Sequence, residues 1–209
     1  GIEQKLRTFV QNGGILIMTY WSGIVNETDL CHLGGTPHHL IDVLGIRSEE
    51  IDGLYDNQCN YMVPASNNFM TLPATYLCTH LCDLVQLKGA VPLMQYADNF
   101  YAGYPALTVH KYGDGLAFYL CADAEDTFYY DFYRQIIQEQ ELPVIMDHIP
   151  EGIEVSSRSS GRQEFIFAQN YTDSPIPFTL PGHAQILFGK YDGTIKEYST
   201  LIYQMEVKS

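Results

Sequence analysis

Basic residues are scarce in this sequence. Its 209 residues include 11 Lys and Arg against 25 Asp and Glu, which gives a formal net charge of −14. Because so acidic a chain is repelled by phosphate backbones and anionic lipid surfaces, we expect no nucleic acid and no membrane among its partners. Long apolar runs are missing too, and the N-terminal stretch GIEQKLRTFVQNGG has no apolar signal-peptide core. These absences predict a cytoplasmic protein.

Cysteines with the spacing of a zinc site or a disulfide framework are also absent. The five cysteines are odd in number and include no CxxC pair; they are Cys31, Cys59, Cys78, Cys82 and Cys121. Cys78 and Cys82 would face one metal ion only from a helix, whereas the β-rich context favours packed thiols. We therefore expect free cysteines, no metal and no cofactor.

The residues that are present begin with a helix and a strand. IEQKLRTFVQ places Ile2, Leu6, Phe9 and Val10 on one helical face, and NGG follows as a stop signal. The apolar run 15–20 then favours a strand buried on both faces. A helix, a tight turn and a buried strand together indicate an α/β domain with a parallel sheet.

The rest of the first domain alternates extended pieces with turns. We expect a short helix over 37–45, ended by Gly45, and a polar excursion from the sheet over 56–75. Gly113-Asp114-Gly115 between two β-rich runs predicts a hairpin. DTFYYDFYRQIIQEQ predicts a helix with Asp126 as N-cap and an inward face. The inward face of this helix is expected to consist of Phe128, Phe132, Ile136 and Tyr129. Extended segments are expected at 46–55, 76–87 and 91–96.

A second domain follows Pro143, which breaks the helical pattern. We divide the chain into an α/β domain over 1–142 and a small antiparallel β-sandwich over 143–209, because turn residues separate its β-like pieces at intervals of about 8 to 12 residues. A carbohydrate-binding module is one alternative for this domain. Two features argue against this alternative. The chain contains no Trp beyond Glu151, and the aromatic residues of this domain, such as Phe165, Phe167, Tyr171 and Phe188, fall mostly at alternating positions that suit a hydrophobic core.

Three stretches carry a family resemblance. GGILIMTYWSGIVNETDLCHLGGTPHHLIDVLGIRSEE and DLVQLKGAVPLMQYADNFYAGYPALTVHKYGDGLAFYLCADAEDTFYYDFYRQII resemble the trimerisation domain of the β-galactosidases of glycoside hydrolase family 42. GIEVSSRSSGRQEFIFAQNYTDSPIPFTL is similar to the small β domain that closes them. The resemblance implies a flavodoxin-like fold, similar to class I glutamine amidotransferases. It also implies that a strand preceding the first helix is lacking here, so the strand over 15–20 is expected to lie at an edge of the sheet.

The resemblance also implies that catalysis and assembly are carried by different domains of the parent enzyme. The parent enzyme would release terminal β-linked galactose with retention, using two glutamates on an N-terminal (β/α)8 barrel of about 250 residues. Those glutamates match no position here, so no catalytic residue is assigned. The implied partners are the chain's own barrel and two further copies in a homotrimer, and a galactoside would be bound only through the barrel.

Glu27, in the pair Asn26-Glu27 beyond the first strand, has the sequence context of a glycosidase acid. A retaining enzyme needs a second carboxylate about 5 to 5.5 Å away, and no strand supplies one. We interpret Glu27 as a loop residue that caps a turn or meets a neighbouring chain. The predicted residues of a subunit or barrel interface are Trp21, Ile24, Val25, Glu27, His32, Phe100 and Tyr101. Sugar stacking by Trp21, Phe100, Tyr101 and Tyr104 is the alternative.

A glutamine amidotransferase-like enzyme is the other catalytic hypothesis. It would need Cys121, at a strand end, as a nucleophile on a glycine-flanked turn with a base downstream. The neighbours Leu120 and Ala122 and the missing His-x-Glu favour a buried structural thiol. The doublet His38-His39 lacks the i, i+4 spacing of two ligands on a helix and indicates packed or solvated histidines.

Overall fold

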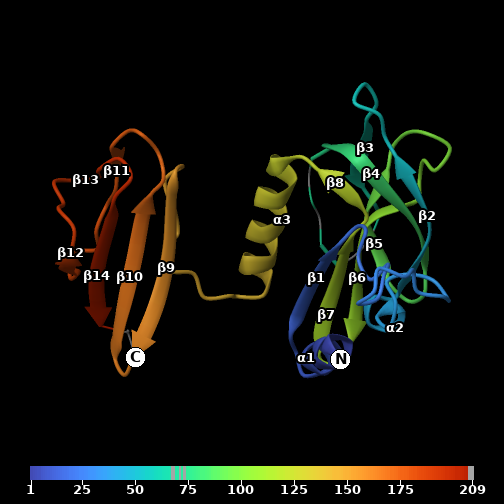
Figure 1. Ribbon diagram of the computed structural model, residues 1–209, viewed down its shortest axis with the longest axis horizontal. Coiled ribbons are helices and arrows are strands. Elements are labelled where there is room, and N and C mark those ends of the chain that lie inside the picture. The colour runs from blue at the N-terminus through green and yellow to red at the C-terminus, as the bar shows by residue number, and fades with distance from the viewer. Residues whose placement is uncertain (67–68, 71, 73, 207–209) are drawn as a thin grey trace. The chain divides into compact units, whose positions relative to one another are not determined.

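The computed structural model describes residues 1–66, 69–70, 72 and 74–206. The chain forms two compact units, Gly1–Gln138 and Glu139–Ser209 (Figure 1). Each unit has its own hydrophobic core. Among the described residues, no helix is long and apolar enough to cross a membrane. The boundary at Pro143 stays a prediction.

Unit 1 is built on a mixed sheet. Its strands lie in the order β1-β7-β6-β5-β3-β4-β2, and β8 pairs with β4. The strands are β1 (Ile15–Thr19), β2 (Ile46–Gly53), β3 (Asn60–Pro64), β4 (Tyr76–Leu87), β5 (Val91–Tyr96), β6 (Pro105–Tyr112), β7 (Gly115–Leu120) and β8 (Ala122–Ala124). Among the described pairs β1–β7 is parallel and the others are antiparallel. The predicted α/β fold is confirmed. The sheet was predicted to be parallel, but among the described strands it contains a single parallel pair.

Strand β1 lies at one end of the described strand order, as predicted, but it is less buried than predicted. It pairs with β7 alone among the described strands. Residues 15–18 are consequently half-buried and Thr19 is exposed, although the continuous apolar run predicted burial on both faces. Segment 56–75 was also predicted wrongly in part, because β3 forms within it and lies between β5 and β4. Residues 67, 68, 71 and 73 of that segment lie outside the described residues.

The helices of unit 1 are α1 (Ile2–Gln11), α2 (Ile41–Leu44) and α3 (Asp126–Glu139). Helix α1 lies against β1 and β7, but only its residue Val10 is fully buried. Helix α2 ends at Gly45, whose φ of 63° is left-handed and whose added Cβ would lie 2.7 Å from the Ala90 nitrogen. Glycine is therefore required at this turn. The hairpin between β6 and β7 is confirmed, with Tyr112 paired to Gly115.

Helix α3 packs on the sheet through one face. Phe128, Phe132 and Ile136 are buried, as their spacing predicts. The Phe132 ring stacks on Phe128 at 5.3 Å and meets Phe118 of β7 edge-on at 5.4 Å, measured between ring centroids. Asp126 is the first helical residue, so it is not the predicted N-cap.

Unit 2 is antiparallel, as predicted. Strands β9 (Ile153–Ser160), β10 (Gln163–Asn170), β12 (Gln185–Phe188) and β14 (Thr200–Glu206) form a sheet in the order β12-β14-β10-β9. Strands β11 (Ile176–Pro177) and β13 (Thr194–Ile195) form a second, short ladder. The described residues that make up its core are Ile153, Ile166, Ala168, Phe178, Ile195, Leu201 and Tyr203.

The core of unit 2 lies on the other face of β10 from the one predicted. Ile166 and Ala168 are fully buried, whereas Phe165 and Phe167 are half-buried. Tyr171 and Phe188 are exposed by 58% and 61%. The alternating aromatics thus do not form the core, because side chains at neighbouring positions of a strand point to opposite faces.

Candidate functional site

The connection from β1 to α2, residues 20–40, holds most of the predicted interface residues. Its polar contacts to itself hold residues 24–32 together, and Leu40 at its end belongs to the core of unit 1. The Asn26 side-chain oxygen accepts hydrogen bonds from the backbone N–H groups of Thr28 and Leu30, at 2.9 and 3.1 Å. An isolated bridge joins Val25 to Cys31, and another joins Thr36 to Ser48 of β2. The connection is therefore a shaped element of unit 1.

Apolar side chains project from this connection into solvent. Trp21 is 56% exposed and Val25 44%, and Leu30 and Leu33 reach 66% and 90%. Ile24 is half-buried. Exposed apolar side chains gathered on one segment are typical of a surface that another protein covers.

Glu27 lies in the turn that Asn26 closes. Its side chain is exposed. A glycosidase acid needs an apolar pocket and a partner carboxylate across the scissile bond. An exposed carboxylate in a turn has no such pocket, so the position suits a turn or contact residue.

Three histidines of the connection pack together. The His32 ring lies 3.9 Å from the His38 ring with 12° between their planes, and His38 lies 3.7 Å from His39. Desolvation, followed by the nearby His32 and His39, lowers the pKa of His38. Within the described residues, no group of three His, Cys, Asp or Glu side chains is arranged to hold a metal ion. The His32 and His38 rings are thus stacked, whereas the His39 ring is tilted by 55° against His38.

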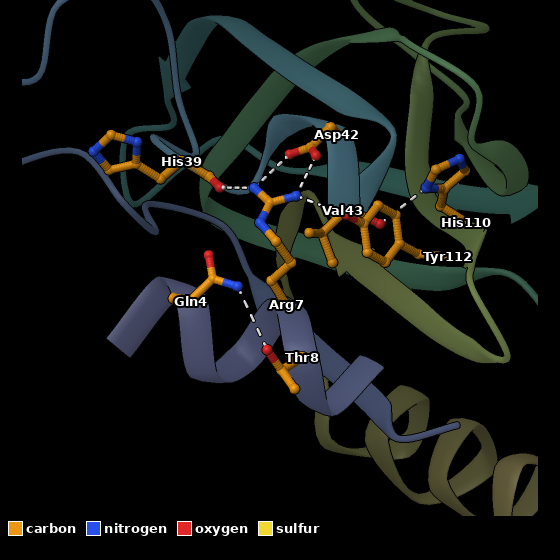
Figure 2. A network of polar contacts seen from close by, with 8 residues as sticks. All are labelled: Gln4, Arg7, Thr8, His39, Asp42, Val43, His110 and Tyr112. Carbon is orange, nitrogen blue, oxygen red and sulfur yellow. Dashed lines mark hydrogen bonds and ion pairs between the residues drawn. The ribbon is translucent and has the colours of Figure 1, made fainter. Parts of the chain in front are cut away.

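Arg7 fastens the connection to the rest of unit 1, as Figure 2 shows. Its guanidinium donates to the Tyr112 hydroxyl of β6 at 2.8 Å and to the His39 carbonyl oxygen at 2.7 Å. It also forms an ion pair with Asp42 of α2, whose Oδ1 lies 2.9 Å from Nη2. The Asp42 hydrogen bond raises the pKa of Arg7, and Arg7 in turn lowers the pKa of Asp42. The sequence reasoning missed this residue.

Asp83 holds the other end of the connection. This carboxylate of β4 is 1% exposed, and its Oδ2 accepts the Tyr119 hydroxyl at 2.6 Å and the Trp21 backbone N–H at 3.3 Å. Burial raises the pKa of the Asp83 carboxyl, although the Tyr119 hydrogen bond opposes the shift. The sequence reasoning missed Asp83 as well. Its signal was an acidic residue within the apolar strand LCDLVQL.

The remaining predicted interface residues lie between β5 and β6. Phe100 is 75% exposed, in agreement with a contact role, and its ring meets Tyr101 edge-on at 5.0 Å. Tyr101 is fully buried, and its hydroxyl donates to Asp52 at 2.8 Å. Tyr101 is thus a core residue that anchors Phe100, which corrects its assignment to a surface.

Cys121 lacks the setting of a nucleophile. It is completely buried, and desolvation raises the pKa of its thiol well above the ordinary value. The reactive thiolate is therefore disfavoured and out of reach of a substrate. The five cysteines are all free, as predicted.

Comparison with known proteins matches both units. The sequence model of the β-galactosidase trimerisation domain matches residues 1–143, and that of the β-galactosidase C-terminal domain matches residues 152–205. The β-galactosidase Pbg of Clostridium perfringens is 40% identical over 173 residues, which cover 82% of this chain and 25% of that protein. BglY of Alicyclobacillus acidocaldarius is 38% identical over 173 residues, with the same coverage.

Solved structures agree with this match. A β-galactosidase from Rahnella sp. R3 superposes with a TM-score of 0.84 at 40% identity, over 99% of this chain and 30% of that one. A β-galactosidase from Bacillus circulans sp. alkalophilus superposes with a TM-score of 0.83 at 31% identity, over 98% and 31%. The chain spans about a quarter of the length of the curated relatives it matches.

The two units are therefore the accessory domains of a glycoside hydrolase. The chain belongs to the β-galactosidases of glycoside hydrolase family 42, as their trimerisation and C-terminal domains. This membership does not favour the amidotransferase and carbohydrate-binding alternatives.

Proposed function

We propose that this chain assembles a parent β-galactosidase into a homotrimer and performs no hydrolysis itself. The parent's own barrel would hydrolyse terminal β-D-galactosyl residues with retention, and the trimer would shape access to it. The observation that carries the proposal is the shaped connection 20–40, which exposes Trp21, Val25, Leu30 and Leu33 together. The match to a trimerisation domain supports it.

Two further assignments complete the proposal. A flavodoxin-like origin for unit 1, shared with class I glutamine amidotransferases, is supported by the order α1–β1 and by the parallel β1–β7 pair. A cytoplasmic location for the parent is supported by the five free cysteines, since thiols persist in a reducing compartment.

The assembly surface predicts the effect of Trp21→Ala on association. We expect the 209-residue chain to associate reversibly in sedimentation equilibrium. Trp21→Ala should weaken that association by about 2 kcal/mol, or about 30-fold in the dissociation constant, because exposed tryptophans are frequent hot spots. Tyr198→Ala, which removes a 72% exposed aromatic of unit 2, is the control and should change little. A monomer at every concentration, or equal effects of both substitutions, would contradict the proposal.

The absence of hydrolysis is predicted separately. We expect the chain to release no chromophore from a chromogenic β-galactoside, because no position matches the family's glutamates and Glu27 is exposed. The measurement is a long incubation at high protein concentration, with the Glu27→Gln variant beside it. Turnover by the chain that disappears in Glu27→Gln would show that Glu27 is catalytic after all.

A further inference from the structure

Trp21 has an unusual backbone conformation. Its φ is 59°, in the left-handed region, where a bulky L-residue is strained by about 1 to 3 kcal/mol. Such strain persists only when the surroundings hold the residue in place. Burial of the ring does not compensate for it, because Trp21 is 56% exposed. The strained conformation therefore directs a large apolar ring toward solvent.

Asp83 holds this conformation through a hydrogen bond to the Trp21 backbone. Its Oδ2 accepts the Trp21 N–H at 3.3 Å, and the Tyr119 hydroxyl, at 2.6 Å, fixes the same oxygen. The backbone on either side is fixed too: the Asp83 N–H donates to the Cys121 carbonyl oxygen at 2.6 Å, and the Tyr96 hydroxyl donates to the Asp83 carbonyl oxygen at 3.2 Å. The carboxylate is thus a rigid acceptor.

The arrangement is costly for the core. Asp83 is 1% exposed, and its second oxygen, Oδ1, is buried and finds no hydrogen-bond partner within the part of the chain that the structure describes. Burying a carboxyl group that is incompletely paired opposes folding. An apolar residue would suit this position of β4 better, since Leu84 and Val85 beside it are buried. Stability of unit 1 therefore does not explain the carboxylate.

We propose that Asp83 is a positioning residue for assembly: it fixes the Trp21 backbone so that the ring is presented, already oriented, to a second copy of the chain. The inference rests on the proposed function and deepens it. A side chain that is ordered before binding loses less conformational entropy when the interface forms. The partner's matching surface would be an apolar pocket that accepts a flat ring.

The chain contains its own reporter for this inference. Trp21 is its only tryptophan, so fluorescence anisotropy at a concentration where the chain is monomeric reads the mobility of this ring alone. Asp83→Leu removes the acceptor but leaves the Tyr119 hydroxyl unpaired. The double variant Asp83→Leu/Tyr119→Phe removes both partners of that buried bond, which restores stability because neither polar group is then left unsatisfied.

Two matched variants separate positioning from stability. Tyr119→Phe keeps the Asp83–Trp21 bond. Tyr76→Phe removes the hydroxyl of another buried tyrosine, which donates to Asp131 and makes no contact with Asp83 in the hydrogen bonds of the described residues. We expect a loss of Trp21 anisotropy in Asp83→Leu and in the double variant, a smaller loss in Tyr119→Phe, and wild-type anisotropy in Tyr76→Phe. Wild-type anisotropy in a double variant that is folded by near-UV circular dichroism would overturn the inference.

Sedimentation of the same variants tests the use of this anchor. If the double variant loses both anisotropy and association while Tyr76→Phe keeps them, positioning for assembly is supported. If Trp21→Ala weakens association but the double variant does not, orientation of the ring is irrelevant and the inference fails while the proposed function stands. If neither weakens association, the connection is not the assembly surface, and the proposed function fails.

Discussion

Phe132→Ala should lower the free energy of unfolding of unit 1 by about 3 to 5 kcal/mol. Phe132 is 1% exposed, and its ring contacts Phe128 on the same helix and Phe118 on β7. Removing the ring leaves a cavity between α3 and β7, because the strand is held in the sheet and cannot move to fill the space. Because domains of this size are stable by only about 5 to 15 kcal/mol, the loss is a large share of the total.

The measurement is a urea titration followed by Trp21 fluorescence, which reports on unit 1 alone because unit 2 contains no tryptophan. Tyr133→Ala is the control. It removes a ring of similar size from the next position of α3, where the side chain is 45% exposed. We expect its midpoint to stay close to that of the wild type. Equal shifts for the two substitutions would mean that α3 is not held by its inward face.

The Phe132 contact could be predicted from the sequence because its signal is local. Phe128, Phe132 and Ile136 repeat at the spacing of one helical face, and all three are buried. The hairpin between β6 and β7 is another local signal, since Gly113 at its turn, with a φ of 61°, supplies the left-handed backbone conformation that the turn requires. Elements of this kind are encoded within about 15 neighbouring residues.

Predictions failed where the outcome depends on which strands become neighbours. The run 15–20 predicted a strand buried on both faces, yet β1 is only half-buried at the end of the described strand order, a position that the resemblance did predict. In β10 the alternation was recognised, but Ile166 and Ala168 face the core and the phenylalanines do not. A period of two residues defines two faces without saying which of them packs against β11 and β13.

The candidate site shows the same division. Trp21 and Val25 were predicted as interface residues from a resemblance and an apolar run, and both are exposed. Asp83 and Arg7, which hold the two ends of the connection, were not predicted. Each acts through partners that are between 32 and 105 positions away in the sequence. Contacts of that separation leave no periodic signal in a single sequence.

Arg7→Met should lower the free energy of unfolding of unit 1 by about 2 to 3 kcal/mol, because hydrogen bonds that involve a charged group contribute more than neutral ones. The substitution keeps much of the aliphatic length of the side chain and removes the donors to Tyr112, the His39 carbonyl oxygen and Asp42. Arg134→Met is the control, since Arg134 is an exposed cation over the Tyr130 ring, and we expect a change of less than about 0.5 kcal/mol.

The pH dependence of this difference separates the ion pair from the other contacts. Arg7 lowers the pKa of Asp42 below its ordinary 3.8, so the stability from this pair is present above pH 3.8 and is lost as the pH falls through the folded-state pKa. The hydrogen bonds from Arg7 to the Tyr112 hydroxyl and to the His39 carbonyl oxygen do not involve the Asp42 carboxylate, so they remain when Asp42 is protonated. We therefore expect the difference in urea midpoint between wild type and Arg7→Met to shrink in acid without vanishing. A difference that stays constant from pH 7 to below the folded-state pKa of Asp42 would show that Asp42 contributes nothing, and that Arg7 fastens the connection through its neutral acceptors alone.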